Sequence, residues 1–165
     1  MASTSFFRSL FTTQEDADLY KYVALTASLM MFHYIITGFT AGGARGKIFT
    51  PEFMEENFGR EHERHYPEGS GVALSKKGGF PDMGSGRYAD KLSYKSWFEF
   101  NNAQRIHYNY LESVTSIVCW LLIAGMNYPK VAIAFGALYI LGRIMYHIGY
   151  KTKGPNGRII GFASC

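Results

Sequence analysis

The stretch Phe98–Glu112, Phe-Glu-Phe-Asn-Asn-Ala-Gln-Arg-Ile-His-Tyr-Asn-Tyr-Leu-Glu, runs without a break into the apolar segment Ser113–Ala124. Arg105, Asn109 and Glu112 are spaced i, i+4 and i+7, so a helix places all three on one face. A polar face is costly to insert into lipid and usually turns toward the protein interior, where it has a function. The pattern therefore predicts a helix whose polar face enters a membrane.

A second polar face follows in Val131–Tyr150, which is separated from the first helix by the short break at 127–130. Arg143, Tyr146 and Tyr150 again repeat at helical spacing, so the two helices form a hairpin with matched polar faces. An unpaired charge is disfavoured in hydrocarbon, and Glu112–Arg143 is the natural internal ion pair. Counting outward from the break predicts four pairs at equal depth: Glu112 with Arg143, Asn109 with Tyr146, Arg105 with Tyr150, and His107 with His147.

The mean hydropathy of −0.08 is that of a soluble protein, but the charges are segregated along the chain. Tyr22–Ala41 and Val131–Tyr150 are nearly free of charge and long enough to cross a hydrocarbon core of about 30 Å. The segment 113–124 crosses only if its helix starts near Phe100. We therefore predict an all-α integral membrane bundle forming a single domain over 1–165. Its parts are a tail at 1–14, membrane helices at 19–43, 100–125 and 130–151, a polar loop at 44–97, and a tail at 152–165.

Local signals set the expected helix ends. Glu15, Asp16 and Asp18 suit the start of the first helix, and Gly42-Gly43 is expected to end it. Thr50 and Pro51 are typical of the N-cap and first position of a short helix in the loop. The glycine-rich segment Lys76–Arg87 is expected to be irregular, and Tyr94–Trp97 is typical of an interfacial anchor.

Charge excludes nucleic acid binding and predicts the orientation in the membrane. The net charge is +4, but the nine basic residues of 42–100 are balanced by nine acidic ones, so no basic patch forms. Basic residues concentrate in this loop and after Tyr150, which predicts that both face the cytosol or the mitochondrial matrix. The Ser/Thr-rich residues 1–14 faintly resemble a mitochondrial presequence. Endoplasmic reticulum and mitochondrion both remain open.

No metal site is predicted, although histidines are present. His62 and His65 lack the i, i+4 spacing of a zinc helix. His33 is interpreted as a helix-contact residue. His107 and His147 at similar depth leave open a haem-binding alternative. Cys119 and Cys165 cannot form a disulfide framework.

Two motifs resemble those of the MAPEG family, the membrane-associated proteins of eicosanoid and glutathione metabolism. They are Gln-Arg-Ile-His-Tyr-Asn-Tyr-Leu-Glu at 104–112 and Gly-Arg-Ile-Met-Tyr-His-Ile-Gly-Tyr at 142–150. The resemblance is closest to the type-3 microsomal glutathione S-transferases. It implies a homotrimer of four-helix bundles that holds glutathione between neighbouring subunits. The chain departs from that pattern in its long loop and in a fourth helix that we expect to be missing.

The resemblance also implies roles for individual residues. Arg105, Asn109 and Glu112 would hold the polar backbone of glutathione, and Arg158 would stabilise its thiolate. The remaining residues expected to bind glutathione are His107, Arg143, Tyr146, Tyr150 and, after the first helix, Arg45 or Lys47.

These expectations lead to two functions of different classes. The first is a glutathione-dependent transferase or peroxidase acting on lipophilic electrophiles or hydroperoxides in the membrane. The alternative is a non-catalytic accessory subunit of a larger membrane complex, possibly mitochondrial, in which the same motifs are structural.

Overall fold

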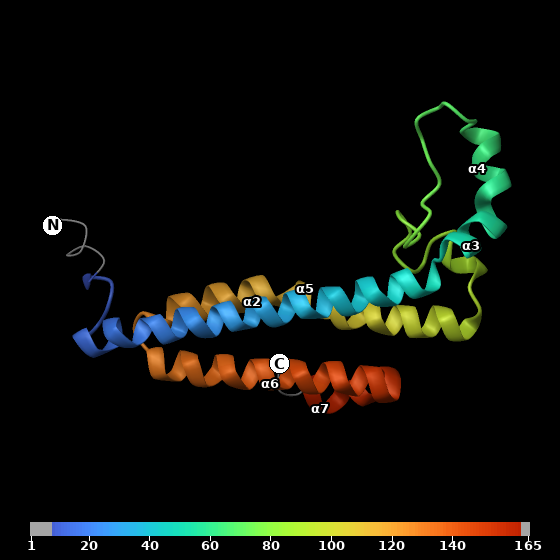
Figure 1. Ribbon diagram of the computed structural model, residues 1–165. Helices are drawn as coiled ribbons and strands as arrows, with labels where there is room; N and C mark the ends of the chain where they lie inside the picture. Colours follow the sequence, from blue (N-terminus) through green and yellow to red (C-terminus); the bar gives the residue numbers. More distant parts are fainter. Residues whose placement is uncertain (1–7, 163–165) are drawn as a thin grey trace. The chain divides into compact units, whose positions relative to one another are not determined.

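The protein is seen in a computed structural model that describes residues 8–162, and helices account for its regular structure (Figure 1). No strand is present in this range, which confirms the all-α prediction. The three long helices are α2 (Gln14–Ile48), α5 (Tyr94–Gly125) and α6 (Pro129–Lys153). The short helices are α3 (Pro51–Met54), η1 (Glu55–Gly59), α4 (Arg60–His65), η2 (Ala89–Lys91), η3 (Gly154–Arg158) and α7 (Ile159–Phe162).

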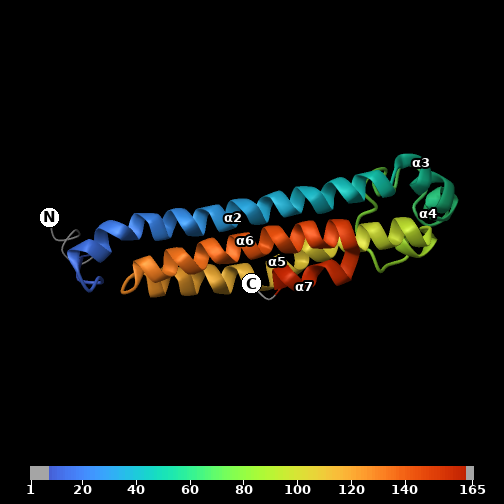
Figure 2. The same ribbon diagram turned by 90° about the horizontal axis from the view of Figure 1, so that it is seen from below.

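The chain forms two compact units. Unit 1 takes in the chain up to Thr37 and from Ile106 onward, and unit 2 is Gly38–Arg105. In unit 1, the first part of α2 lies beside the second part of α5 and beside α6 (Figures 1 and 2). Its core joins all three helices and consists of Val23, Ala27, Met30, Tyr110, Val114, Leu121, Ala132 and Tyr139.

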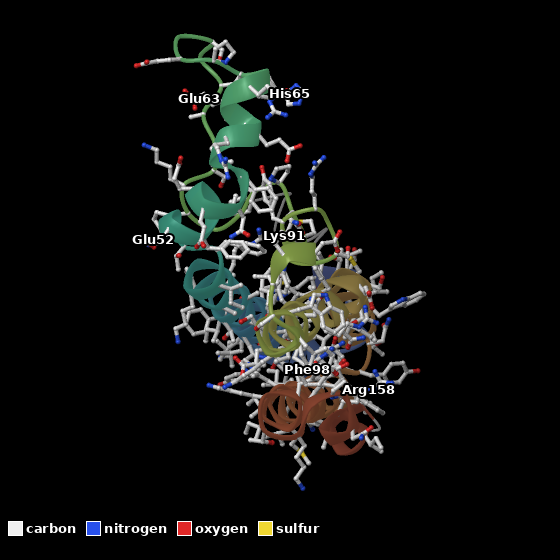
Figure 3. The ribbon with its side chains drawn as sticks, turned by 90° about the vertical axis from the view of Figure 1, so that its right-hand side faces the viewer. Glu52, Glu63, His65, Lys91, Phe98 and Arg158 are labelled. Atoms are coloured by element: carbon white, nitrogen blue, oxygen red, sulfur yellow. The ribbon has the colours of Figure 1, made fainter. Side chains whose placement is uncertain are left out.

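Unit 2 has a hydrophobic core of its own. Phe49, Met54, Phe58, Ala89 and Phe100 are buried together, and Phe49 meets Phe100 edge to face at 5.3 Å. Most of the polar loop therefore folds around apolar side chains. Figure 3 labels Glu52 on α3, Glu63 and His65 on α4, and Lys91 on η2, all in this unit.

The predicted start of α3 is confirmed. Thr50 caps the helix by accepting a hydrogen bond from the backbone N–H of Phe53 at 3.2 Å, and Pro51 occupies the first position. The segment 66–88 contains no helix, as expected for its glycine-rich part.

Two helix ends differ from the expectation. α2 continues through Gly42-Gly43 to Ile48, so Arg45 and Lys47 lie in its last turn. Glycine lowers helix stability by only about 1 kcal/mol, which tertiary packing readily outweighs. α5 begins at Tyr94 because Ser93 caps it by accepting from the backbone N–H of Ser96.

Two helical segments in the described range are long and apolar enough to cross a membrane, Gln14–Ile48 and Pro129–Arg158. α5 keeps charged residues as far as Glu112 and carries none afterward. The first and third predicted membrane helices are therefore long and apolar enough to span a membrane.

Residues that precede α2 contact the long helices of unit 1. Before α2, Thr12 donates to Asn127 at 2.8 Å, so this part of the predicted tail contacts the α5–α6 turn. Residues 1–7 of the presequence-like segment and Cys165 lie outside the described range.

After α6 the chain reverses through η3, and α7 lies beside the end of α6 (Figures 1 and 2). Glycine permits this approach. A Cβ atom on Gly149 would overlap the carbonyl of Gly157, and one on Gly161 would overlap the backbone of Tyr146. The predicted C-terminal tail is thus helical over its described part and packed against α6.

Asp82 organises the irregular segment of unit 2. Its buried carboxylate accepts backbone N–H bonds from Gly84 at 2.7 Å, Gly86 at 3.0 Å and Ala89 at 2.9 Å. Burial alone would raise the pKa of this carboxyl, but these hydrogen bonds outweigh burial and hold the pKa below its ordinary value.

We expect Asp82→Asn to destabilise unit 2 by about 2 kcal/mol at neutral pH, because an amide oxygen replaces a carboxylate that accepts three hydrogen bonds. The carboxylate contributes fully above the ordinary aspartate pKa of about 3.9 and loses its contribution as pH falls through the lower folded pKa. Hydrogen exchange over residues 82–91 measures the effect. The exposed Asp90→Asn is the control, and equal exchange in both variants would refute the role of Asp82.

Candidate functional site

A buried arginine lies at the centre of the polar faces of α5 and α6. Arg143 donates to Asn109 Oδ1 at 2.7 Å, Ser113 Oγ at 2.5 Å and Tyr139 Oη at 2.9 Å. A longer bond of 3.4 Å reaches the backbone carbonyl of Asn109. The two terminal nitrogens of the guanidinium therefore connect two helices through neutral acceptors. The buried Nε of Arg143 has no hydrogen-bond partner in the described part of the chain.

Three tyrosine rings surround the same guanidinium. Its carbon atom lies 4.6 Å from the ring centroid of Tyr110, 5.0 Å from that of Tyr139 and 5.8 Å from that of Tyr146. Cation–π attraction adds to the hydrogen bonds when the group is removed from water. This cage fixes the Arg143 side chain and, through it, the carboxamide of Asn109.

The predicted Glu112–Arg143 ion pair is wrong. Arg143 lies level with Asn109, one helical turn from its predicted partner, and Tyr146 and Tyr150 pack with Ile106. Glu112 is exposed and accepts from Asn109 Nδ2 at 3.4 Å. The two polar faces do converge, as predicted, but with a shifted register.

Arg158 returns toward α6 from η3. Its Nη1 donates to the hydroxyl of Tyr150 at 3.2 Å, and the arginine itself remains exposed. Tyr150 is buried and its ring lies 5.0 Å from that of Tyr146. The structure thus brings Arg158, which was expected in the C-terminal tail, together with Tyr146 and Tyr150 of the last predicted membrane helix.

The two basic candidates at the end of α2 differ in their surroundings within unit 2. Arg45 is buried, donates to the carbonyl of Gly78 at 2.7 Å and lies 4.3 Å from the ring of Phe80. Lys47 is exposed. Since the guanidinium of Arg45 is engaged by the loop, Lys47 is the more accessible cation for an external anion.

The other predicted residues lie on α5. Arg105 is exposed in the half of α5 that belongs to unit 2. His107, in unit 1, makes a hydrogen bond of 3.0 Å between Nδ1 and Thr37 Oγ1 and stacks on Tyr34 at 4.8 Å. His107 therefore helps to join α5 to α2.

Sequence reasoning missed Ser113 and Tyr139 as partners of Arg143. Both carried a usable signal, because Ser113 is four residues after Asn109 and Tyr139 is four residues before Arg143. Residues four apart share a helix face, so both positions extend the polar faces already identified.

Comparison with known proteins gives one result for the family and one for the structure. The family model described as the MAPEG family matches residues 19–164, which is most of the chain. No solved structure matches the chain.

Proposed function

The chain belongs to the MAPEG family of membrane proteins, and from this premise we propose that it is a glutathione-dependent transferase or peroxidase. Its substrates would be lipophilic electrophiles or hydroperoxides that arrive from the membrane. The match over residues 19–164 includes both motifs, and the apolar helices agree with a membrane location.

The observation that carries the proposal is the contact between Arg158 and Tyr150. The exposed guanidinium of Arg158 donates to the buried Tyr150, and its other N–H groups can bind a neighbouring anion while this hydrogen bond is kept. A thiol is a poor nucleophile until it ionises, and a nearby guanidinium lowers its pKa. Arg158 would therefore stabilise the thiolate form of glutathione.

The remaining charges of glutathione fit exposed residues of the first motif and of the last turn of α2. Its two carboxylates suit Arg105 and Lys47, because a guanidinium binds a carboxylate in bidentate fashion and an ammonium offers a compact charge. Glu112 would accept from the ligand's ammonium or an amide. Arg143 is buried and engaged, so its role is to position Asn109.

We expect the detergent-solubilised protein to bind immobilised glutathione and Arg105→Ala to reduce the retention at least tenfold, because a charge-assisted hydrogen bond is lost. Lys95→Ala is the matched control, since Lys95 is an exposed cation on the same helix but outside the motif. Equal retention of wild type and both variants would exclude Arg105 from the site.

The accessory-subunit alternative is favoured by one feature, the separate hydrophobic core of unit 2. A folded polar unit of this kind offers a surface for other subunits. Gentle extraction from native membranes separates the two functions. Migration as a homotrimer that retains glutathione supports the enzyme, whereas migration within a large complex without glutathione retention supports the alternative.

A further inference from the structure

A cavity with a mixed apolar and basic lining lies in unit 1, between α2 and α6. It has a volume of about 200 Å³ and shares no lining residue with the Arg143 network or the Arg158–Tyr150 contact. Its wall consists of His33 from α2 and of Ile144, His147, Ile148, Lys151 and Thr152 from α6.

One histidine of the cavity wall has a ring nitrogen without a partner. His33 Nδ1 is buried and has no hydrogen-bond partner within the described part of the chain. A buried polar atom of this kind is costly unless something satisfies it. His147 lines the same cavity, so two imidazole rings border it.

The cavity is also lined by a cationic side chain, that of Lys151. Lys151 belongs to the basic last turn of α6, at the end of an apolar helix long enough to span a membrane. A lysine in this position extends its ammonium toward the lipid head groups. Thr152 donates its hydroxyl proton to the carbonyl of Ile148 at 2.8 Å, which leaves Lys151 and the imidazoles as the donors to a ligand.

The apolar part of the wall completes the pattern. Ile144 and Ile148 are 38% and 56% exposed, so both present apolar surface in the cavity that Lys151 also lines. One full positive charge and two imidazoles match a singly charged anion better than a dianion. Basic pockets between membrane helices are typical binding sites for anionic lipid head groups.

We propose that this cavity binds the phosphodiester head group of an anionic phospholipid. Lys151 and His147 donate to the phosphate, His33 borders the same cavity, and an acyl chain lies along Ile144 and Ile148. This site is independent of the proposed glutathione site.

The test is native mass spectrometry of the full chain in neutral detergent, with dioleoylphosphatidylglycerol and zwitterionic dioleoylphosphatidylcholine as probes. We expect the wild type to retain the anionic lipid preferentially. Lys151→Gln and His147→Gln should each weaken its binding about tenfold, as expected for the loss of a hydrogen bond to a charged group. Lys153→Gln removes the same charge two residues further along α6, where the side chain does not line the cavity, and should retain wild-type binding.

Equal retention of the two lipids overturns the proposal, and so does an equal loss in Lys151→Gln and Lys153→Gln, which indicates nonspecific attraction. Competition by inorganic phosphate at the lipid's concentration would also overturn it, because free phosphate lacks the acyl chain that contacts the isoleucines. Circular dichroism and glutathione retention of each variant verify the fold. Lipid loss with unchanged glutathione retention separates this site from the proposed function.

Discussion

Replacing Arg143 by alanine is expected to lower the unfolding free energy of unit 1 by about 3 kcal/mol, the largest stability effect that we predict. The substitution removes the donors to Asn109, Ser113 and Tyr139. Ser113 and Tyr139 keep their mutual hydrogen bond of 2.9 Å, whereas Asn109 Oδ1 loses its bond to Arg143. It also removes the cation from its tyrosine cage. Thermal or SDS-induced unfolding in a fixed detergent measures the loss.

Two further variants make this expectation specific. Arg143→Lys should fall between wild type and Arg143→Ala, because an ammonium keeps the charge but lacks the planar fork that reaches all three partners. Glu112→Gln should lose less stability than Arg143→Ala, since Arg143 is not paired with Glu112. A loss in Glu112→Gln as large as that in Arg143→Ala would instead favour the ion pair predicted from the sequence.

Gly149→Ala is expected to reduce glutathione-dependent turnover about 100-fold, because a displacement of about 1 Å at a catalytic group costs this much. The added methyl group meets the backbone carbonyl of Gly157, which cannot rotate away as a side chain would. Moving Gly157 moves the adjacent Arg158 away from Tyr150. Overpacking at this contact should also cost about 2 kcal/mol of stability.

Gly42→Ala is the matched control for this substitution. Gly42 also lies in a long helix, but a Cβ atom there meets nothing within 4 Å. Alanine favours the helix by about 1 kcal/mol over glycine, so the control should retain activity and gain slight stability. Turnover in Gly149→Ala equal to that of the control would show that η3 does not position Arg158.

The sequence predicted the hairpin well because periodic polar positions mark a helix face regardless of the tertiary context. It did not predict the register, because the position of the turn at 126–128 sets depth only to within about one helical turn. The structure therefore pairs Arg143 with Asn109 in place of Glu112. The neutral partners Ser113 and Tyr139 were overlooked because an ion pair was expected to satisfy the arginine.

In the polar loop, the sequence did not predict the tertiary structure. The sequence predicted a polar loop with one short helix and an irregular glycine-rich part, yet Phe49, Met54 and Phe58 of this loop form a core with Phe100 of α5. Phe49, Met54 and Phe58 lie close together in the sequence, but Ala89 and Phe100 are far from them, so only the folded chain brings the two groups together. Asp82 was overlooked for a similar reason, since its partners are backbone N–H groups that no side-chain motif reveals.

The role assigned to Arg158 and glutathione is tested most directly by an ultraviolet difference spectrum. Glutathione is titrated at neutral pH into the detergent-solubilised wild-type protein and into Arg158→Ala. We expect a thiolate band that saturates with the wild type and is absent from Arg158→Ala, although that variant still retains glutathione. Bound glutathione that stays protonated in the wild type, or an equal band in both proteins, would contradict this role.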